Sequence, residues 1–188
     1  MMLLKSALFV VIGLAVLAAG LVAYAATQPD SFRVARSTTI AAPREAIFPL
    51  ITDLRKFATW SPYEKKDPDM TRSFGGPESG KGQSYAWEGN GSVGAGSLVV
   101  ADVQAPSRID IDLNMLKPIS AKNLITFTLE PAGGATKVTW SMQGQSPLMA
   151  KVAHLFFNVD KMVGGDFEAG LADLKAMVEG GSAAAPHA

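Results

Sequence analysis

Hydrophobic residues dominate the start of the chain, where Ser6 to Ala26 form a run without any charge. As a helix rising about 1.5 Å per residue, such a run spans roughly 30 Å, the thickness of the hydrocarbon core of a bilayer. It therefore predicts a single transmembrane anchor. Its small-x-small ending at Ala25 fits equally a secretory signal that is cleaved there. Lys5 precedes the run and Asp30 is the first charge after it, so in both cases we expect the body to lie outside the cytoplasm.

The body begins with alternating positions and then changes to a helical spacing. Phe32–Ile40 alternates, imperfectly, and predicts a strand. Pro43 suits the first turn of a helix, and Pro49 should kink that helix or split it into two. Phe57–Met70 contains two prolines and is predicted to be a loop. The apolar positions at helical spacing are Ile47, Leu50, Ile51, Leu54 and Phe57.

A period of two then runs from Tyr85 to Met142 and indicates an antiparallel meander of short strands. Turns are expected about every ten residues, and Gly133-Gly134 is one of them. The apolar positions that define the strands are Tyr85 and Trp87; Leu98–Val103; Ile109, Ile111, Leu113 and Met115; Ile125, Phe127 and Leu129; and Val138, Trp140 and Met142.

The last pattern is an apolar stripe of helical period that reaches Val178. Ser146 is a favoured cap and Pro147 a favoured first residue, so one long helix is predicted, with room for a bend at Gly164-Gly165. Strands followed by a striped helix are typical of a two-layer α+β domain, in which a curved sheet wraps the helix around a solid or hollow interior. We expect an anchor or signal over 1–27, this domain over 28–180 and a disordered tail over 181–188.

A glycine motif, G-x-G-x-x-G, is formed by Gly89, Gly91 and Gly94. A dinucleotide site needs a helix directly after these glycines, because the pyrophosphate lies against the helix N-terminus. Here the strand pattern of Leu98–Val103 follows instead. The motif is therefore interpreted as a turn between antiparallel strands, in which Gly and Asn supply positive φ.

Composition removes several classes of function. Seventeen basic and seventeen acidic residues cancel, and Lys65-Lys66 is the longest basic run, so no nucleic-acid partner is expected. Cysteine is absent, which excludes disulfides, thiolate metal sites and cysteine nucleophiles. The two histidines have no metal-ligand spacing. The sequence therefore predicts neither a metal nor another cofactor, and it leaves the oligomeric state open.

Four segments resemble bacterial SRPBCC proteins of the START and polyketide-cyclase-like superfamily. They are Ile51–Met70, Tyr85–Gly96, Lys137–Gly144 and Asp160–Glu179. The resemblance implies the helix-grip fold, a curved antiparallel sheet around a long C-terminal helix, with a pocket for a hydrophobic small molecule or lipid between them. With the charges around the N-terminal run, we expect the tethered domain to lie in the periplasm, or to be secreted if the signal is cleaved. Functions in this superfamily range from lipid transfer to polyketide cyclisation.

Candidate catalytic groups are few, and we expect binding rather than catalysis. The alternative is a cyclase- or dehydratase-like enzyme that uses Asp67, Glu64 or Tyr63 in a closed pocket. Asp67-Pro68 is also a natural turn starter, which gives that residue a structural interpretation.

Aromatic and methionine side chains are the best candidates for contacts with an apolar ligand. Trp60 and Tyr63 lie in the predicted loop and favour a rim or lid. Phe127 and Trp140 lie on inward strand faces, where they could equally fill the core. The full predicted set is Trp60, Tyr63, Tyr85, Trp87, Met115, Phe127, Trp140, Met142, Leu155 and Val159.

Overall fold

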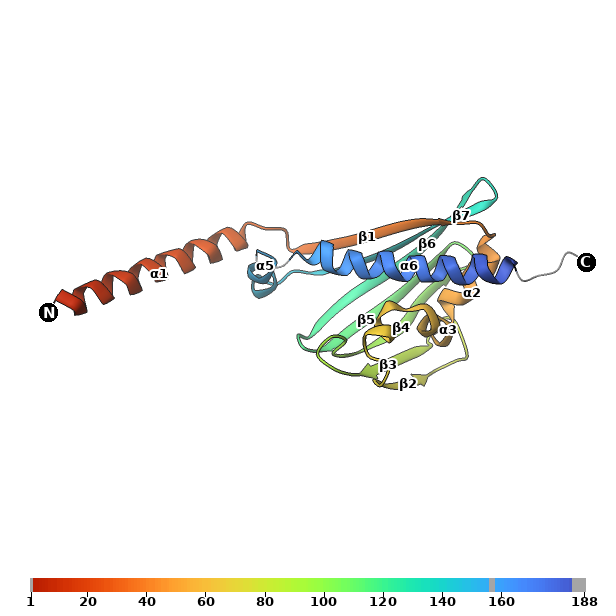
Figure 1. Ribbon diagram of the computed structural model, residues 1–188, viewed down its shortest axis with the longest axis horizontal. Helices are drawn as coiled ribbons and strands as arrows, with labels where there is room; N and C mark the ends of the chain where they lie inside the picture. Colours follow the sequence, from red (N-terminus) through yellow and green to blue (C-terminus); the bar gives the residue numbers. More distant parts are fainter. Residues whose placement is uncertain (1, 156–157, 184–188) are drawn as a thin grey trace, which may run out of the picture. The chain divides into compact units, whose positions relative to one another are not determined.

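The structure, a computed structural model, describes residues 2–155 and 158–183. They fall into two compact units. One consists of the chain up to Phe32 together with Gln145–Val159, and the other of Arg33–Gly144 together with the chain from Asp160 onward. Figure 1 labels most of the helices and strands of both.

The expected helix at the start of the chain is present as α1 (Met2–Ala26). Large apolar side chains on its described part, including Leu14, Val16 and Leu17, are exposed, whereas Ala25 at its end is fully buried. Among the described residues, no helix combines the length and the hydropathy needed to cross a membrane. The prediction of a transmembrane segment is thus not confirmed.

Asp30, four residues after the end of α1, contacts the start of α5 (Leu148–His154) within the smaller unit. Lys151 Nζ lies 2.6 Å from Asp30 Oδ1, and the Ser146 N–H donates to the Asp30 carbonyl at 2.7 Å. The predicted capping role of Ser146 is wrong, because Pro147 occupies the cap position and makes no side-chain hydrogen bond there. Ser146 instead uses its backbone to hold Asp30.

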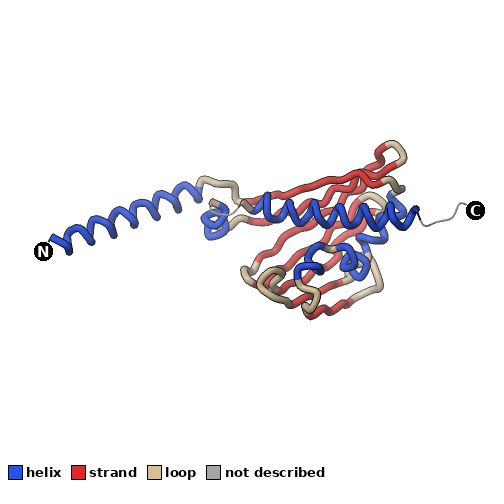
Figure 2. Tube along the Cα trace, viewed as in Figure 1, coloured by secondary structure: helices blue, strands red, loops and turns tan. Residues whose placement is uncertain are grey.

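The larger unit is built on a seven-stranded sheet of order β1-β7-β6-β5-β4-β3-β2 (Figure 2). Neighbouring strands from β2 to β7 pair antiparallel, which confirms the predicted meander. Only β2 lies outside the predicted strands, and its sequence lacks apolar alternation. The strands are β1 (Ser31–Ile40), β2 (Thr71–Gly75), β3 (Ser84–Glu88), β4 (Ala95–Gln104), β5 (Arg108–Lys117), β6 (Ala121–Ala132) and β7 (Ala135–Gln145).

Three short helices connect β1 to β2: α2 (Arg44–Thr52), α3 (Leu54–Trp60) and α4 (Pro62–Lys66). A split into two helices does occur, but at Asp53 and not at Pro49 as predicted. The Asp53 carboxylate accepts a hydrogen bond from the Arg55 N–H at 2.9 Å and so caps α3. Pro49 lies inside α2.

The loop predicted over 57–70 is largely helical, so that prediction is wrong. Pro62 is the first residue of α4, where a missing N–H costs nothing, and Pro68 follows the end of α4. Both prolines therefore lie outside a helix interior.

The single long helix predicted after Ser146 is in fact two helices, α5 and α6 (Val159–Ala183). Asn158, a favoured capping residue type, precedes α6, and Asp160 places a negative charge in its first turn. Gly164 and Gly165 lie inside α6. The tail expected from 181 begins within the last turn of α6, and the rest of it, residues 184–188, lies outside the described residues.

The core of the larger unit lies where α3 and α6 meet the sheet. Trp140 of β7 stacks on Phe167 of α6, with ring centroids 4.2 Å apart. Phe57 and Trp60 of α3 meet Trp140 edge-on, with centroids 5.9 and 5.8 Å away. Phe127 of β6 is fully buried beside them. This aromatic cluster fixes α3 and α6 on one face of the sheet.

The turn between β3 and β4 settles the meaning of the glycine motif. Gly94 has φ of +64°, and the Gly89 N–H donates to the Gly94 carbonyl at 2.9 Å. Strand β4 begins at Ala95, so no helix follows, and the interpretation as a turn is confirmed. Asn90 does not adopt positive φ, which corrects that detail of the prediction.

Candidate ligand-binding cavity

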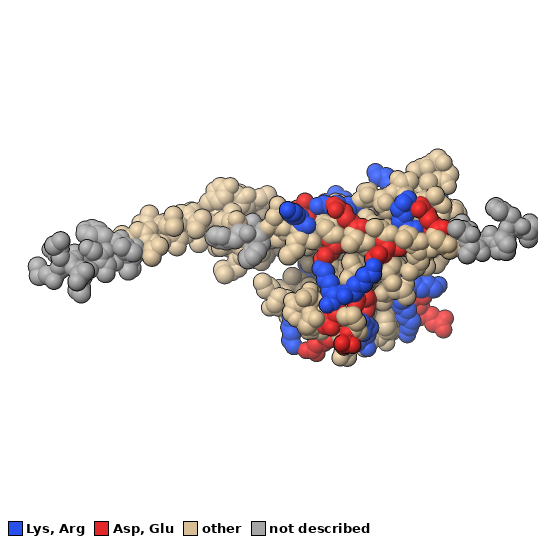
Figure 3. Space-filling view, in the orientation of Figure 1, with Lys and Arg blue, Asp and Glu red and all other residues tan. Residues whose placement is uncertain are grey.

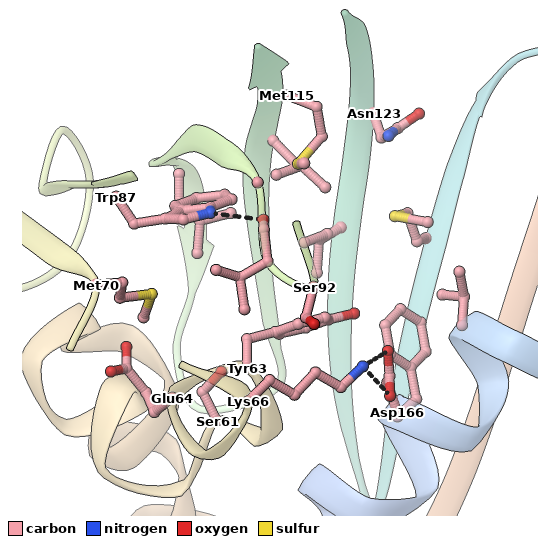
Figure 4. A pocket seen from close by; sticks show the side chains of 18 of the residues that line it. Ser61, Tyr63, Glu64, Lys66, Met70, Trp87, Ser92, Met115, Asn123 and Asp166 are labelled. Carbon is pink, nitrogen blue, oxygen red and sulfur yellow. Dashed lines mark hydrogen bonds and ion pairs between the residues drawn. The ribbon is translucent and has the colours of Figure 1, made fainter. Parts of the chain in front are cut away.

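The larger unit contains a partly enclosed cavity of about 310 Å³ between the sheet, α4 and α6. Figure 4 shows it from close by. This volume lies at the lower end of the range of small-molecule sites, roughly 300–1,000 Å³. The apolar side chains that line it are Phe57, Met70, Trp87, Val93, Leu98, Leu113, Met115, Pro118, Ile125, Trp140, Met142, Met162, Val163 and Phe167.

The side-chain repeats of strands and helices explain how residues far apart in the sequence line the same cavity. Leu113 and Met115 are two positions apart on β5, as are Trp140 and Met142 on β7, so each pair points to the same face of the sheet. On α6, the lining positions 162, 163, 166 and 167 fall on one helical face. The cavity is thus lined by the inward face of the sheet and one stripe of α6.

A close packing between β3 and β4 shapes the wall that holds Trp87. A Cβ added at Gly96 would come within 2.8 Å of Trp87 Cζ2. The glycine therefore allows the indole ring to lie flat across β4. The Trp87 N–H donates to the Val93 carbonyl at 3.1 Å, which fixes the ring at the cavity wall.

One wall of the cavity is polar and joins α4 to α6. Lys66 Nζ lies 2.7 Å from both carboxylate oxygens of Asp166, as the dashed lines in Figure 4 show. The same ammonium lies 5.2 Å from the centroid of the Tyr63 ring. Burial raises the pKa of Tyr63, and the negative charge and hydrogen bond of Asp166 raise it further, so Tyr63 keeps its phenol proton.

A second polar group is centred on Glu64, also from α4. The Tyr85 hydroxyl donates to Glu64 Oε1 at 2.5 Å, and Arg72 Nε donates to Glu64 Oε2 at 2.7 Å. The Glu64 side chain is 16% exposed, so both of its oxygens have partners in a largely dry setting. Burial, followed by the hydrogen bond and charge of Glu64, raises the pKa of Tyr85.

Six residues of the predicted contact set line the cavity: Tyr63, Tyr85, Trp87, Met115, Trp140 and Met142. The other four do not. Trp60 and Phe127 lie in the aromatic core, 1% and 0% exposed, so Trp60 is buried there and not placed at a rim or lid. Leu155 and Val159 belong to the smaller unit. Whether the six lining residues touch a ligand stays a prediction.

The three candidate catalytic groups, Asp67, Glu64 and Tyr63, differ in whether they line the cavity. Tyr63 and Glu64 line the cavity, whereas Asp67 does not. Asp67 Oδ2 accepts a hydrogen bond from the Asn90 N–H at 2.7 Å and so supports the β3–β4 turn. Among the residues whose side chains are described, no cluster of three or more side chains suits a metal ion.

Sequence reasoning missed the polar contribution of α4 and α6, namely Lys66 and Asp166. The adjacent lysines 65 and 66 were visible as the longest basic run. Their partners lie about 100 positions away, at a spacing of seven on α6, which is two helical turns. Matching a pair of lysines to a pair of aspartates on one helical face is the signal that could have found them.

A family described as polyketide cyclase / dehydrase and lipid transport matches residues 31–179 of the chain. The search of curated proteins found no sequence that matches this chain. A crystal structure of a Rhodobacter sphaeroides protein is similar with a TM-score of 0.58 and 19% identity, covering 79% of this chain and 92% of that one.

Two further crystal structures are similar at the level of fold. Protein CV1439 from Chromobacterium violaceum has a TM-score of 0.55 and 16% identity, covering 81% of this chain and 99% of its own. Protein Ms6760 from Mycobacterium smegmatis has a TM-score of 0.54 and 17% identity, covering 79% and 91%. The expected SRPBCC resemblance and the helix-grip architecture are confirmed.

Proposed function

Because the chain belongs to the polyketide cyclase / dehydrase and lipid transport family, we propose that it binds one hydrophobic small molecule or single-chain lipid in the cavity between the sheet and α6. The observation that carries this proposal is the apolar wall formed by inward strand residues and one face of α6. Each 100 Å² of apolar ligand surface removed from water contributes about 2.5 kcal/mol. An apolar wall of this kind supports binding without a catalytic group.

A cyclase-like reaction is the second candidate, and Tyr63 and Glu64 in the cavity favour it. A general base needs a free lone pair directed at the substrate. Both oxygens of Glu64 already accept hydrogen bonds, so a substrate proton would have to compete with Tyr85 and Arg72, and Tyr63 keeps its own proton. The geometry therefore supports binding better than catalysis.

The experiment that tests the proposal begins with the purified full chain freed of apolar molecules by organic extraction and refolding. It is incubated with a total bacterial lipid extract, re-purified and examined by native mass spectrometry. We expect one bound apolar molecule per chain, identified by fragmentation. A spectrum that shows only the unliganded mass, from protein with native circular dichroism, would contradict the proposal.

A further inference from the structure

We infer that the cavity selects neutral, oxygen-bearing apolar molecules, such as long-chain alcohols or ketones, over carboxylates with the same chain. This inference rests on the proposed binding function and adds the chemical class of the ligand. It follows from how the charges on the polar wall are paired.

Lys66 is the only cation among the described residues that line the cavity, and its charge is already paired with Asp166. Both oxygens of Asp166 lie 2.7 Å from its ammonium group. The side chains of Lys66 and Asp166 are 36% and 20% exposed, so solvent screens this pair only in part. Glu64 adds a second negative charge to the lining. Its ion-pair partner, Arg72, does not itself line the cavity.

A ligand carboxylate would therefore meet two carboxylates and no free cation. If it approached the remaining N–H of Lys66, two negative charges of the same sign, its own and that of Asp166, would share a single cation. Burying a charge without a partner is strongly unfavourable. The wall thus opposes the anionic head of a fatty acid.

A neutral oxygen meets no such conflict. An ammonium group carries three N–H donors, and the two contacts with Asp166 leave one for a ligand carbonyl or hydroxyl. A ligand hydroxyl can also donate to Asp166, whose oxygens each have two lone pairs. Figure 4 shows Tyr63, Lys66 and Asp166 grouped together, with Trp87 and Met115 farther along the cavity, an arrangement that suits a molecule with one polar end.

The chain supplies a matched control for this arrangement. Lys65, the neighbour of Lys66 on α4, pairs with Asp173 of α6 at 2.6 Å, and neither residue lines the cavity. Both ion pairs join the same two helices. Replacing Asp173 therefore reproduces the loss of one α4–α6 ion pair without changing the charge of the cavity.

The test uses the full chain and two probes, decanol and decanoate, titrated calorimetrically at neutral pH, where decanoate is ionised. The unmodified protein is expected to bind decanol at least about tenfold more tightly than decanoate, a difference of about 1.4 kcal/mol. Asp166→Asn keeps the shape of the side chain but frees the Lys66 charge. It should raise decanoate affinity by about tenfold and leave decanol affinity within about twofold, whereas Asp173→Asn should change neither.

Three results would overturn the inference. The first is equal affinity of the unmodified protein for both probes, which needs no variant and so does not depend on variant folding. The second is a folded Asp166→Asn protein with unchanged decanoate affinity. The third is the same gain in Asp173→Asn. If the unmodified protein binds neither probe, the proposed binding function itself fails, which separates the two claims.

Discussion

Three tryptophans of this chain have nearly the same chemistry but different surroundings. The Trp60 N–H donates to the Leu50 carbonyl at 2.9 Å, and the Trp87 N–H donates to the Val93 carbonyl. The Trp140 N–H is buried and has no hydrogen-bond partner among the described residues. Trp60 and Trp140 are each 1% exposed and share one aromatic cluster, but they differ in this hydrogen bond, and Trp140 also lines the cavity. An unpaired buried donor costs free energy that a phenylalanine at the same place avoids.

We therefore expect Trp60→Phe to be more destabilising than Trp140→Phe. Both lose ring area, but Trp60→Phe also leaves the Leu50 carbonyl without this donor, which adds about 1–3 kcal/mol to the loss in the free energy of unfolding. Urea denaturation of the two variants measures the difference. Equal losses, or a larger loss for Trp140→Phe, would show that the hydrogen bond is not what distinguishes these residues.

At the scale of elements, Arg36 of β1 makes several polar contacts with α6, beside the hydrogen bond from Lys175 of α6 to the Thr39 carbonyl of β1. Arg36 donates to both carboxylate oxygens of Asp160, at 3.1 and 3.0 Å, and to Glu168 at 2.6 Å. Gly164 lies between these two acids, and a Cβ added there would overlap the Arg36 guanidinium group. Glycine at position 164 is thus needed so that the Arg36 guanidinium group can approach the α6 backbone closely. This explains why a residue of low helical propensity lies inside the helix at this position.

The neighbouring glycine allows a matched comparison. Gly165 has open space where its Cβ would be, so Gly165→Ala should stabilise the protein by about 0.5–1 kcal/mol through helix propensity alone. Gly164→Ala gains the same propensity but must push Arg36 away from Asp160 and Glu168, so its stability should fall clearly below that of Gly165→Ala. Thermal melts of both variants decide this. Indistinguishable melting temperatures would contradict the proposed role of Gly164.

At the scale of the whole molecule, repeating patterns were predictable and single junctions were not. The meander followed from the period of two, because one face of each strand packs against the core. The segment Phe57–Met70 was misjudged because the positions of its prolines relative to helix ends are decided by tertiary packing. The break between α5 and α6 was missed because an apolar stripe keeps its period across two helices.

The residues that line the cavity likewise divide into those that the sequence pattern predicts and those that it does not. Apolar lining residues such as Met115 and Met142 were predictable because they alternate along strands. The pairing of Lys66 with Asp166 was not, because the two residues are 100 positions apart and the alignment of α4 with α6 brings them together. In Figure 3, acidic and basic side chains intermingle over the face that carries α6, as expected from the balanced charge.

The most direct test of the account is whether filling the cavity abolishes binding. Met115 lines the cavity, whereas Leu116, the next residue of β5, is 57% exposed and does not. We predict that calorimetry with decanol will show at least about a tenfold loss of affinity in Met115→Trp and an unchanged affinity in Leu116→Trp. A folded Met115→Trp protein that binds decanol as tightly as the unmodified chain would show that the ligand is held somewhere else.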